Sequence, residues 1–308
     1  MKNGVDATGI SAVLKLYKQS TIQEALVRSA RGREVGVLVG ELGKAGVGFY
    51  LKRPDVLQYP SDVMEFVKRG ATSFHVSVER WSNPMQLGPG LRQEEVAQLR
   101  SGWDLVLDID CPFLEISQIA ADLVVQALGY YDISSITAKF SGNHGFHICV
   151  PFNAFPEMIG DKPTKDWFPD GPRRIAMYVQ QSMIRQHLTK RILAKTDVAT
   201  LAGKMKKQTS ELLTNGVFDP FKVVSIDTIL ITTRHLFRAP YSFNEKSGLV
   251  SVPVDPGKIL EFDKDLARPE NVVVRYPFLE DSARPGEAKR LLVQAFDFKM
   301  PEEKRERV

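Results

Sequence analysis

The chain has 308 residues, a formal net charge of +4 and a composition that is 43% hydrophobic and 25% charged, which is typical of one large or two small globular domains. Its only cysteines, Cys111 and Cys149, exclude a zinc site made of three or four cysteines and a disulfide framework. No apolar run reaches the length of a membrane span and the N-terminus lacks the apolar core of a signal peptide, so we expect a soluble protein of a reducing cytosol with no membrane partner.

The N-terminal third alternates between helical and strand-like patterns. Apolar residues recur at helical spacing in residues 11–30. Short helices are also predicted at residues 61–68, capped by Ser61, and at residues 93–100, which are polar. Strand-like runs occupy residues 34–39, 47–51 and 74–78. The connector between the first two runs contains Gly40, Gly43 and Gly46, which predicts a β-hairpin.

Two carboxylates lie two residues apart in the apolar run Leu105–Asp110, which is bounded by Gly102 and Pro112 and predicts a strand. Side chains alternate between faces along a strand, so Asp108 and Asp110 point to the same side. Two like charges on one face of a mostly buried strand are costly unless a cation or hydrogen bonds compensate them. The pair indicates either a site for Mg²⁺ or Mn²⁺, which prefer oxygen ligands, or a strand end at which both carboxylates are solvated.

A helix at residues 116–128 and strands at 133–140 and 146–150 are predicted next. The turn Ser141-Gly142-Asn143-His144-Gly145 joins the two strands, and its glycines permit positive φ. His147 lies just inside the second strand. Residues 155–171 are rich in proline and aromatic residues and are expected to form an irregular loop.

A basic segment runs from residue 173 to residue 207, with nine lysines or arginines and a single acidic residue, Asp197. Apolar residues recur through it at helical spacing, which predicts an amphipathic helical insert at about residues 155–220. Its basic outer face either is simply solvated or follows a phosphate backbone.

The C-terminal part begins with a strand at residues 223–227 that ends in a third carboxylate, Asp227. The segment after it is basic and contains Arg238. Further strands are predicted at residues 249–254 and 271–276, and a last helix at residues 287–296.

Three carboxylates gathered at one site could hold two divalent ions about 3.5–4 Å apart, the arrangement that clamps the attacking and leaving oxygens in phosphoryl transfer. Ser141, His147 and Arg238 are of the types that bind a triphosphate. No Gly-x-x-x-x-Gly-Lys-Ser/Thr motif occurs, which disfavours a P-loop kinase or ATPase. A metal-dependent nuclease could use the same carboxylates, but the Ser-Gly…Gly-x-His turn favours a triphosphate ligand.

In this order and spacing, the motifs resemble those of the catalytic (small) subunit of archaeal and eukaryotic DNA primases, within the archaeo-eukaryotic primase superfamily. The resemblance extends from about residue 10 to residue 265. It rests on four segments: Leu105–Asp110, Ser141–His147, Ile226-Asp227 and His235–Ser242. Arg33-Glu34-Val35 and Lys246-Ser247-Gly248 resemble two further family segments.

The resemblance implies a role for each matching residue. Asp108, Asp110 and Asp227 would be the catalytic carboxylates that bind two Mg²⁺ or Mn²⁺ ions. The incoming triphosphate would be held by Ser141, Asn143, His144, His147 and Arg238. With a looser alignment, Arg33 and Arg53 would reach the same phosphates.

Three departures from the family pattern bear on these roles. His144 stands where the family usually has arginine, and because histidine is only partly charged near neutral pH, triphosphate affinity could be weaker or pH-dependent. Asn244 stands where many relatives have histidine, so no role is carried over to it. Residues 111–140 contain one cysteine and no histidine, where most members carry a Cys/His zinc knob, so we predict no structural zinc.

The resemblance implies an α/β (α+β) fold with a mixed, largely antiparallel sheet flanked by helices, and one catalytic domain over residues 1–308 that includes the helical insert. It implies an enzyme, the catalytic subunit of a DNA primase, which makes short primers from NTPs or dNTPs on single-stranded DNA with a large subunit as partner. Such a protein would be cytoplasmic and nucleoid-associated in an archaeal-type cell.

Two alternatives stay open at this point. A primase-polymerase of a repair, plasmid or defence system would mainly extend existing ends. A non-catalytic nucleic-acid-binding protein would keep the fold but would be expected to lack one of the three carboxylates, and all three are present.

Overall fold

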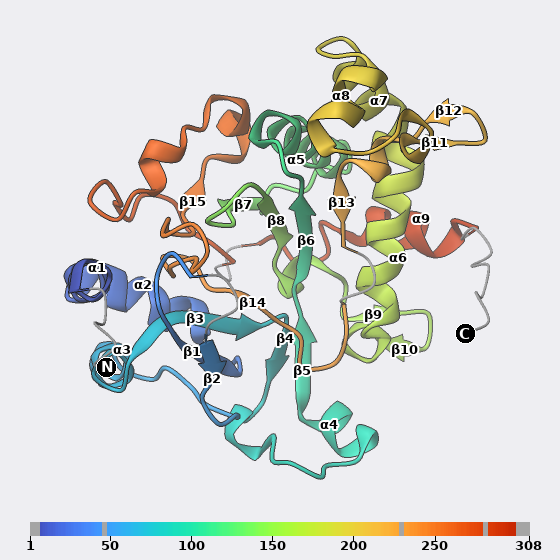
Figure 1. The fold of residues 1–308 in the computed structure, drawn as a ribbon. Coiled ribbons are helices and arrows are strands. Elements are labelled where there is room, and N and C mark those ends of the chain that lie inside the picture. The colour runs from blue at the N-terminus through green and yellow to red at the C-terminus, as the bar shows by residue number, and fades with distance from the viewer. Residues whose placement is uncertain (1–6, 45–47, 228–230, 280–282, 300–308) are drawn as a thin grey trace.

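The computed structural model describes residues 7–44, 48–227, 231–279 and 283–299. In these ranges the strands pair only in the antiparallel direction, and helices flank them (Figure 1). The expected α/β fold is confirmed, although most strands divide between two main sheets instead of forming one. None of the helices in the described ranges is both long and apolar enough to span a membrane.

The first sheet has the order β14-β3-β1-β2, and helices from the N-terminal region pack against it (Figure 1). Its strands are β1 (Val35–Gly40), β2 (Gly48–Tyr50), β3 (Ala71–Ser77) and β14 (Leu236–Arg238). The helices are α1 (Ala7–Tyr17), α2 (Ser20–Ala30) and α3 (Pro60–Lys68). The predicted hairpin is confirmed as the β1–β2 pair, and Gly46 of its connector lies outside the described residues.

Tyr17, at the end of α1, fixes the helical layer to this sheet. Its ring packs edge-on against Phe74 of β3 and against Phe243, with ring centres 5.2 and 5.8 Å away. Its hydroxyl donates a hydrogen bond of 3.0 Å to the carbonyl oxygen of Thr72. A buried tyrosine whose hydroxyl has a partner contributes apolar area without leaving a polar group unsatisfied.

The second sheet has the order β13-β6-β8-β7-β15. Its strands are β6 (Leu105–Asp110), β7 (Thr137–Phe140), β8 (Phe146–Val150), β13 (Ser225–Ile226) and β15 (Pro253–Val254). Helix α5 (Leu114–Gly129) packs on β6 and β8. Phe140 and Phe146 meet Phe262 with ring centres 4.8 and 5.5 Å away, so a continuous apolar layer lies on one face of this sheet.

Helices form much of the segment at about residues 155–220 that was predicted as a helical insert (Figure 1). It contains α6 (Asp170–Tyr178), a π-helical turn at Val179–Ile184, α7 (Arg185–Leu193) and α8 (Val198–Met205). It continues through the 3₁₀ segments η5 (Thr209–Leu212) and η6 (Pro220–Lys222), with the short pair β11 (Leu213–Thr214) and β12 (Val217–Phe218) between them. Helix α9 (Lys289–Asp297) packs on α6.

The remaining elements are short. They are β4 (Glu79–Trp81), β5 (Arg100–Trp103), α4 (Gln93–Leu99), β9 (Met158–Ile159), β10 (Lys162–Pro163), and the 3₁₀ segments η1 (Pro84–Gln86), η2 (Phe152–Ala154), η3 (Thr164–Trp167), η7 (Pro256–Glu261) and η8 (Lys264–Ala267). The strand pair β9–β10 and η3 show that the expectation of an irregular loop over residues 155–171 was only partly right.

Two strand predictions were wrong in the C-terminal part. Residues 271–276 form no strand, because their alternating burial comes from Val272 and Val274 packing onto the protein without a neighbouring strand to pair with. Of residues 249–254 only β15 is a strand, since Val250 instead bridges to Phe243 in the preceding loop. Alternating apolar and polar side chains are typical of a half-buried strand, but a strand forms only where a second backbone segment is available for hydrogen bonding.

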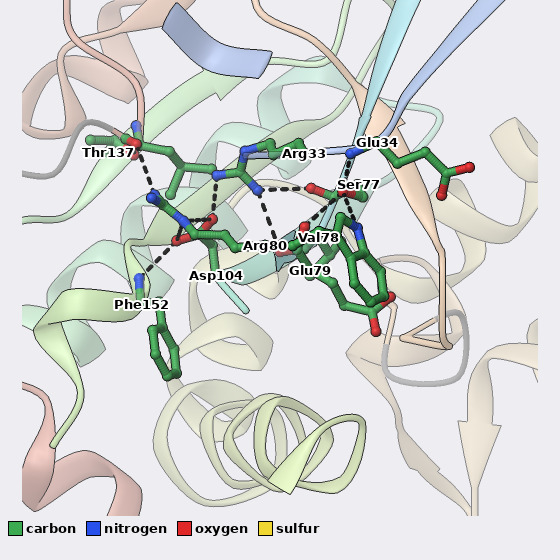
Figure 2. A network of polar contacts seen from close by, with 11 residues as sticks. Arg33, Glu34, Ser77, Val78, Glu79, Arg80, Asp104, Thr137 and Phe152 are labelled. Carbon is green, nitrogen blue, oxygen red and sulfur yellow. Dashed lines mark hydrogen bonds and ion pairs between the residues drawn. The ribbon is translucent and has the colours of Figure 1, made fainter. Parts of the chain in front are cut away.

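A buried carboxylate joins the two sheets (Figure 2). Asp104 lies between β5 and β6 with no exposed surface, and it accepts from the guanidinium groups of Arg33 and Arg80. The backbone N–H of Phe152 donates a further bond of 2.7 Å to Oδ1. Burial alone would raise the pKa of Asp104, but the two arginines and these hydrogen bonds outweigh it and lower the pKa.

Arg33 extends this network into the first sheet. Its Nη1 donates 2.7 Å to the carbonyl oxygen of Ser77 at the end of β3. The arginine is 2% exposed, so its charge depends on Asp104 for compensation. The start of β6 is therefore held at a fixed position relative to β3.

We predict that Asp104→Asn lowers the free energy of unfolding by about 3–5 kcal/mol, because two arginines lose their buried counter-charge. The depressed pKa means that this contribution is complete above the ordinary carboxyl value of 3.8 and is lost as pH falls through the lower folded-state value. Urea unfolding should therefore show a difference between variant and wild type that shrinks only in acid.

Glu65→Gln is the matched control, since Glu65 forms an exposed ion pair with Lys68. Such pairs contribute about 0–1 kcal/mol. Equal losses in the two variants would contradict the role given to Asp104.

Candidate active site

Three polar side chains line up across the second sheet. Asp108 of β6 is the register partner of His147 on β8, which in turn is the partner of Lys139 on β7. Directly paired residues of antiparallel strands have their side chains on the same face. Nε2 of His147 lies 3.4 Å from Oδ1 of Asp108. The sheet therefore carries a row of one acid, one imidazole and one buried amine.

The other two predicted carboxylates lie beside this row. Asp110 is the register partner of Ser225 on β13, and the backbone N–H of Asp227 donates 3.0 Å to the carbonyl oxygen of Asp108. Asp108 and Asp110 of β6 thus neighbour Asp227, which directly follows β13.

The charges of these residues act on one another. Burial raises the pKa of Asp108 to about 7, and the like charges of Asp110 and Asp227 add to the rise while Lys139 opposes it. Nearly half of the Asp108 side chain, 47%, stays accessible, so solvent screens part of this effect. A cation placed between the carboxylates would relieve the same repulsion.

His147 is neutral at physiological pH. Burial lowers its pKa well below the ordinary value, and the cations Lys139 and Arg238 lower it further. Burial also lowers the pKa of Lys139, to about 7, and its amine donates 2.8 Å to the hydroxyl of Ser251. Within the described ranges no hydrogen-bond partner reaches the buried Nδ1 of His147.

The turn between β7 and β8 folds against the end of β6. The backbone N–H of Ser141 donates 2.9 Å to the Gly145 carbonyl, and the Gly145 N–H donates 3.2 Å to the Ser141 hydroxyl. Gly142 has φ +98°, and a Cβ there would lie 2.8 Å from Cβ of Asn244. A Cβ at Gly145 would overlap the carbonyl oxygen of Ile109. Both glycines are therefore needed for the turn to approach the carboxylates.

His144 and Asn143, in the same turn, are half-buried. Burial lowers the pKa of His144, Lys264 and Lys246 lower it further, and Asp110 opposes them. His144 therefore lies within electrostatic range of a catalytic carboxylate and of two lysines. Its charge at neutral pH is small, as the departure from the usual arginine suggested.

Arg238 is brought near the row from the first sheet. It is the register partner of His75 on β3, and both residues act electrostatically on His147. Its guanidinium makes two bonds to Glu245, of 3.1 and 3.0 Å, and one to the Phe243 carbonyl. Three of its five N–H groups are used in this way, and two can meet a phosphate.

Arg53 and Arg33 are placed differently from each other. Arg53 makes bonds of 2.9 and 2.8 Å to the buried carboxylate of Glu34, and its side chain is 28% exposed. Arg33 instead is buried against Asp104. The structure does not bring Arg33 to the carboxylates as a free cation, because its guanidinium is committed to that pair.

The residue types at this site are suitable ligands for a divalent metal. The three carboxylates supply oxygen ligands and negative charge, which suit Mg²⁺ or Mn²⁺. Their side chains do not converge on one point, since in the part of the chain that the structure describes no group of three or more His, Cys, Asp or Glu residues is arranged to hold an ion.

The sequence of this region matches a known family. Residues 108–256, just under half of the chain, match the family model described as DNA primase small subunit. Over this segment the chain is similar to the DNA primase small subunit family, in agreement with the resemblance found in the sequence. The match contains every predicted site residue except Arg33 and Arg53, and it indicates a nucleotidyltransferase.

The fold has relatives among solved structures. It is similar to the polymerase domain of Mycobacterium tuberculosis ligase D in complex with DNA, with a TM-score of 0.52 and 16% identity over 95% of this chain and 91% of that chain. The primase-polymerase domain of cyanophage S-2L matches with a TM-score of 0.33 and 12% identity over 83% of this chain and 97% of that chain, which is too weak to carry an argument. The chain matches no curated protein.

Two residues of the site were missed by sequence reasoning. Lys139 is a lysine in an apolar strand, and its position two residues before Ser141 could have drawn attention to it. His75 lies in a strand-like run, where a histidine is more often a core or surface residue than a ligand. It is 6% exposed, its Nδ1 lacks a hydrogen-bond partner within the described ranges, and only the pairing of β3 with β14 places it beside Arg238.

We predict that Gly145→Ala destabilises the protein by about 1–3 kcal/mol and raises KM for the nucleotide, because the new methyl group pushes the turn away from Ile109. Urea unfolding and steady-state kinetics measure the two effects.

Gly129→Ala is the control. Gly129 ends α5, nothing lies within 4 Å of a Cβ there, and alanine favours a helix by about 0.5–1 kcal/mol. A Gly145→Ala protein with unaltered KM would show that the turn does not hold the nucleotide.

Proposed function

We propose that this chain catalyses template-directed nucleotidyl transfer on single-stranded DNA and makes short primers from NTPs or dNTPs, as a primase catalytic subunit. The observation that carries this proposal is the placement of Asp108 and Asp110 next to Asp227, beside the glycine-dependent turn that begins with Ser141. Carboxylates for cations and donors for a triphosphate are the two requirements of this chemistry.

The chain's own residues would divide the work. Asp108, Asp110 and Asp227 would hold two Mg²⁺ or Mn²⁺ ions, which when bound lower the pKa of the attacking 3′-hydroxyl and neutralise developing charge. The Ser141 hydroxyl accepts from the turn and keeps its own proton to donate to a phosphate oxygen. Neutral His147 offers a ring nitrogen without adding charge next to Asp108.

The triphosphate would lie against the turn and Arg238. Arg238 is anchored by Glu245, so its remaining N–H groups point in a fixed direction and little side-chain entropy is lost on binding. Asn143 and His144 would contact the same phosphates from the turn. Arg53, held by Glu34, is a second cation for the outer phosphates, whereas we assign Arg33 to the Asp104 pair.

The remaining expectations stay predictions. They are a single catalytic domain, a primase large subunit as partner, a cytoplasmic location and the lack of structural zinc. De novo synthesis on single-stranded DNA would distinguish a replicative primase from an enzyme that mainly extends existing ends.

We predict that Asp108→Asn/Asp110→Asn lowers the rate of nucleotide incorporation by at least about 10³-fold, because the loss of two carboxylates removes metal stabilisation of several kcal/mol. The assay contains single-stranded template, labelled NTPs or dNTPs and Mg²⁺ or Mn²⁺. Asp161→Asn, which removes an exposed carboxylate from the β9–β10 turn, should retain full activity.

Wild-type protein that gives no product under these conditions would refute the proposed activity. Equal activity in the wild type and the double variant would refute the site assignment alone.

We predict that His144→Arg lowers KM for the nucleotide by about three- to tenfold at pH 8, because it adds a charge-assisted hydrogen bond to the triphosphate. The lowered pKa of His144 leaves the wild-type side chain neutral at this pH. His144→Gln, which stays neutral, is the control, and a KM that rises in the arginine variant would show that His144 does not face the phosphates.

A further inference from the structure

Seven of the nine lysines and arginines in residues 173–207 form two groups. In the first group, three arginines and one lysine are tied to acidic residues or to a carbonyl group. These contacts are Arg185 with Asp219, Arg191 with Asp122, Lys195 with Glu115, and Arg174 with the Phe296 carbonyl. The contacts of Arg191, Lys195 and Arg174 join the insert to α5 and α9, and that of Arg185 lies within the insert, so this part of the predicted basic face is structural.

The second group lies at the C-terminal end of α8. Lys204, Lys206 and Lys207 are exposed, and residues 198–210 contain these three lysines and no acidic residue. Gln208, Thr209 and Ser210 follow directly and are exposed as well. We call residues 204–210 the basic turn. Its side chains offer positive charge together with amide and hydroxyl donors.

The backbone of the basic turn is fixed. The N–H groups of Lys206 and Lys207 donate to the carbonyls of Gly203 and Ala202, at 3.1 and 3.0 Å, and end the helix with Lys206 at φ +55°. Leu201 before the turn and Leu212 after it are buried. The three lysines therefore project from an ordered surface, where binding a ligand costs little backbone entropy.

The basic turn is connected to the carboxylates through packed elements. Helix α8 packs on η5, η5 on η6, and η6 on β13, whose partner strand β6 carries Asp108 and Asp110. Figure 1 shows α8 beyond the C-terminal end of β6, the end at which Asp110 lies. A chain of phosphates held at the basic turn would thus lie beyond the end of β6 that carries Asp110.

We propose that the basic turn binds the sugar-phosphate backbone of the single-stranded template, without reading its bases. The inference rests on the proposed function for the identity of the ligand. Lysines that neutralise phosphates release counterions, which supplies sequence-independent affinity. The hydroxyl and amide groups of residues 208–210 add hydrogen bonds to phosphate oxygens. Exposed bases would remain available for pairing at the active site.

The test compares two triple variants with the same change in charge. One is Lys204→Gln/Lys206→Gln/Lys207→Gln, and the control is Lys15→Gln/Lys18→Gln/Lys68→Gln, which removes three exposed lysines beside α1 and α3. Binding of a fluorescent oligothymidylate of about 30 nucleotides is followed by anisotropy between about 0.05 and 0.2 M salt. Nucleotide KM is measured at saturating template.

The basic-turn variant should bind the oligonucleotide at least about tenfold more weakly at low salt. The slope of log K against log salt concentration should be smaller in magnitude by about 2, because each phosphate contact of a single strand contributes about 0.7 to that slope. The control should bind as the wild type does, and nucleotide KM should be unchanged in both. If the basic-turn variant bound the oligonucleotide with the affinity and salt dependence of the wild type, the inference would be overturned. An acidic protein would then be favoured as the partner of this surface.

The proposed function is tested separately by the Asp108→Asn/Asp110→Asn variant. That variant should bind the oligonucleotide normally and fail to synthesise. If the wild type binds DNA through the basic turn but synthesises nothing, the proposed function fails while the basic turn keeps its ligand. If the wild type binds no DNA at all, the inference falls.

Discussion

The buried ion network at Asp104 is the constraint on which the rest of this molecule depends. Its carboxylate lies directly before β6, and the two arginines that compensate it come from the segment before β1 and from β4. Removing three charges from water is costly, and only their close pairing and the added backbone bonds make it tolerable. Because Asp108 and Asp110 follow within the same strand, the network also sets their position relative to the sheet that carries Arg238.

The site itself combines opposite electrostatic demands. On one side, burial and the repulsion among three carboxylates raise the pKa of Asp108. On the other, Lys139 and Arg238 lie close enough to His147 to lower its pKa, and Glu245 pairs with Arg238. A cation would relieve the repulsion among the carboxylates, and a polyanion would add partners for Lys139 and Arg238. A metal-bound triphosphate supplies both, which is the physical reason for preferring nucleotidyl transfer over binding alone.

Sequence reasoning succeeded where a local pattern carries the information. The run that contains Asp108 and Asp110 was predicted as a strand from its apolar residues and from the residues that flank it. The turn in Ser141–His147 was predicted from its glycines. Sequence reasoning failed where pairing depends on distant backbone, as at residues 271–276. The basic insert was read as one continuous face, whereas Asp122, Glu115 and Asp219 divide its cations into structural and exposed ones.

By itself, the sequence determined the chemical types present at the site and their order, because strand periodicity, turn glycines and motif spacing are local properties. Only the tertiary structure decided which charges are already compensated. Arg33 looked like a phosphate ligand and is buried against Asp104, while Lys139 and His75, to which no motif pointed, lie beside the site. Compensation depends on partners that are distant in the chain, so no local pattern could have revealed it.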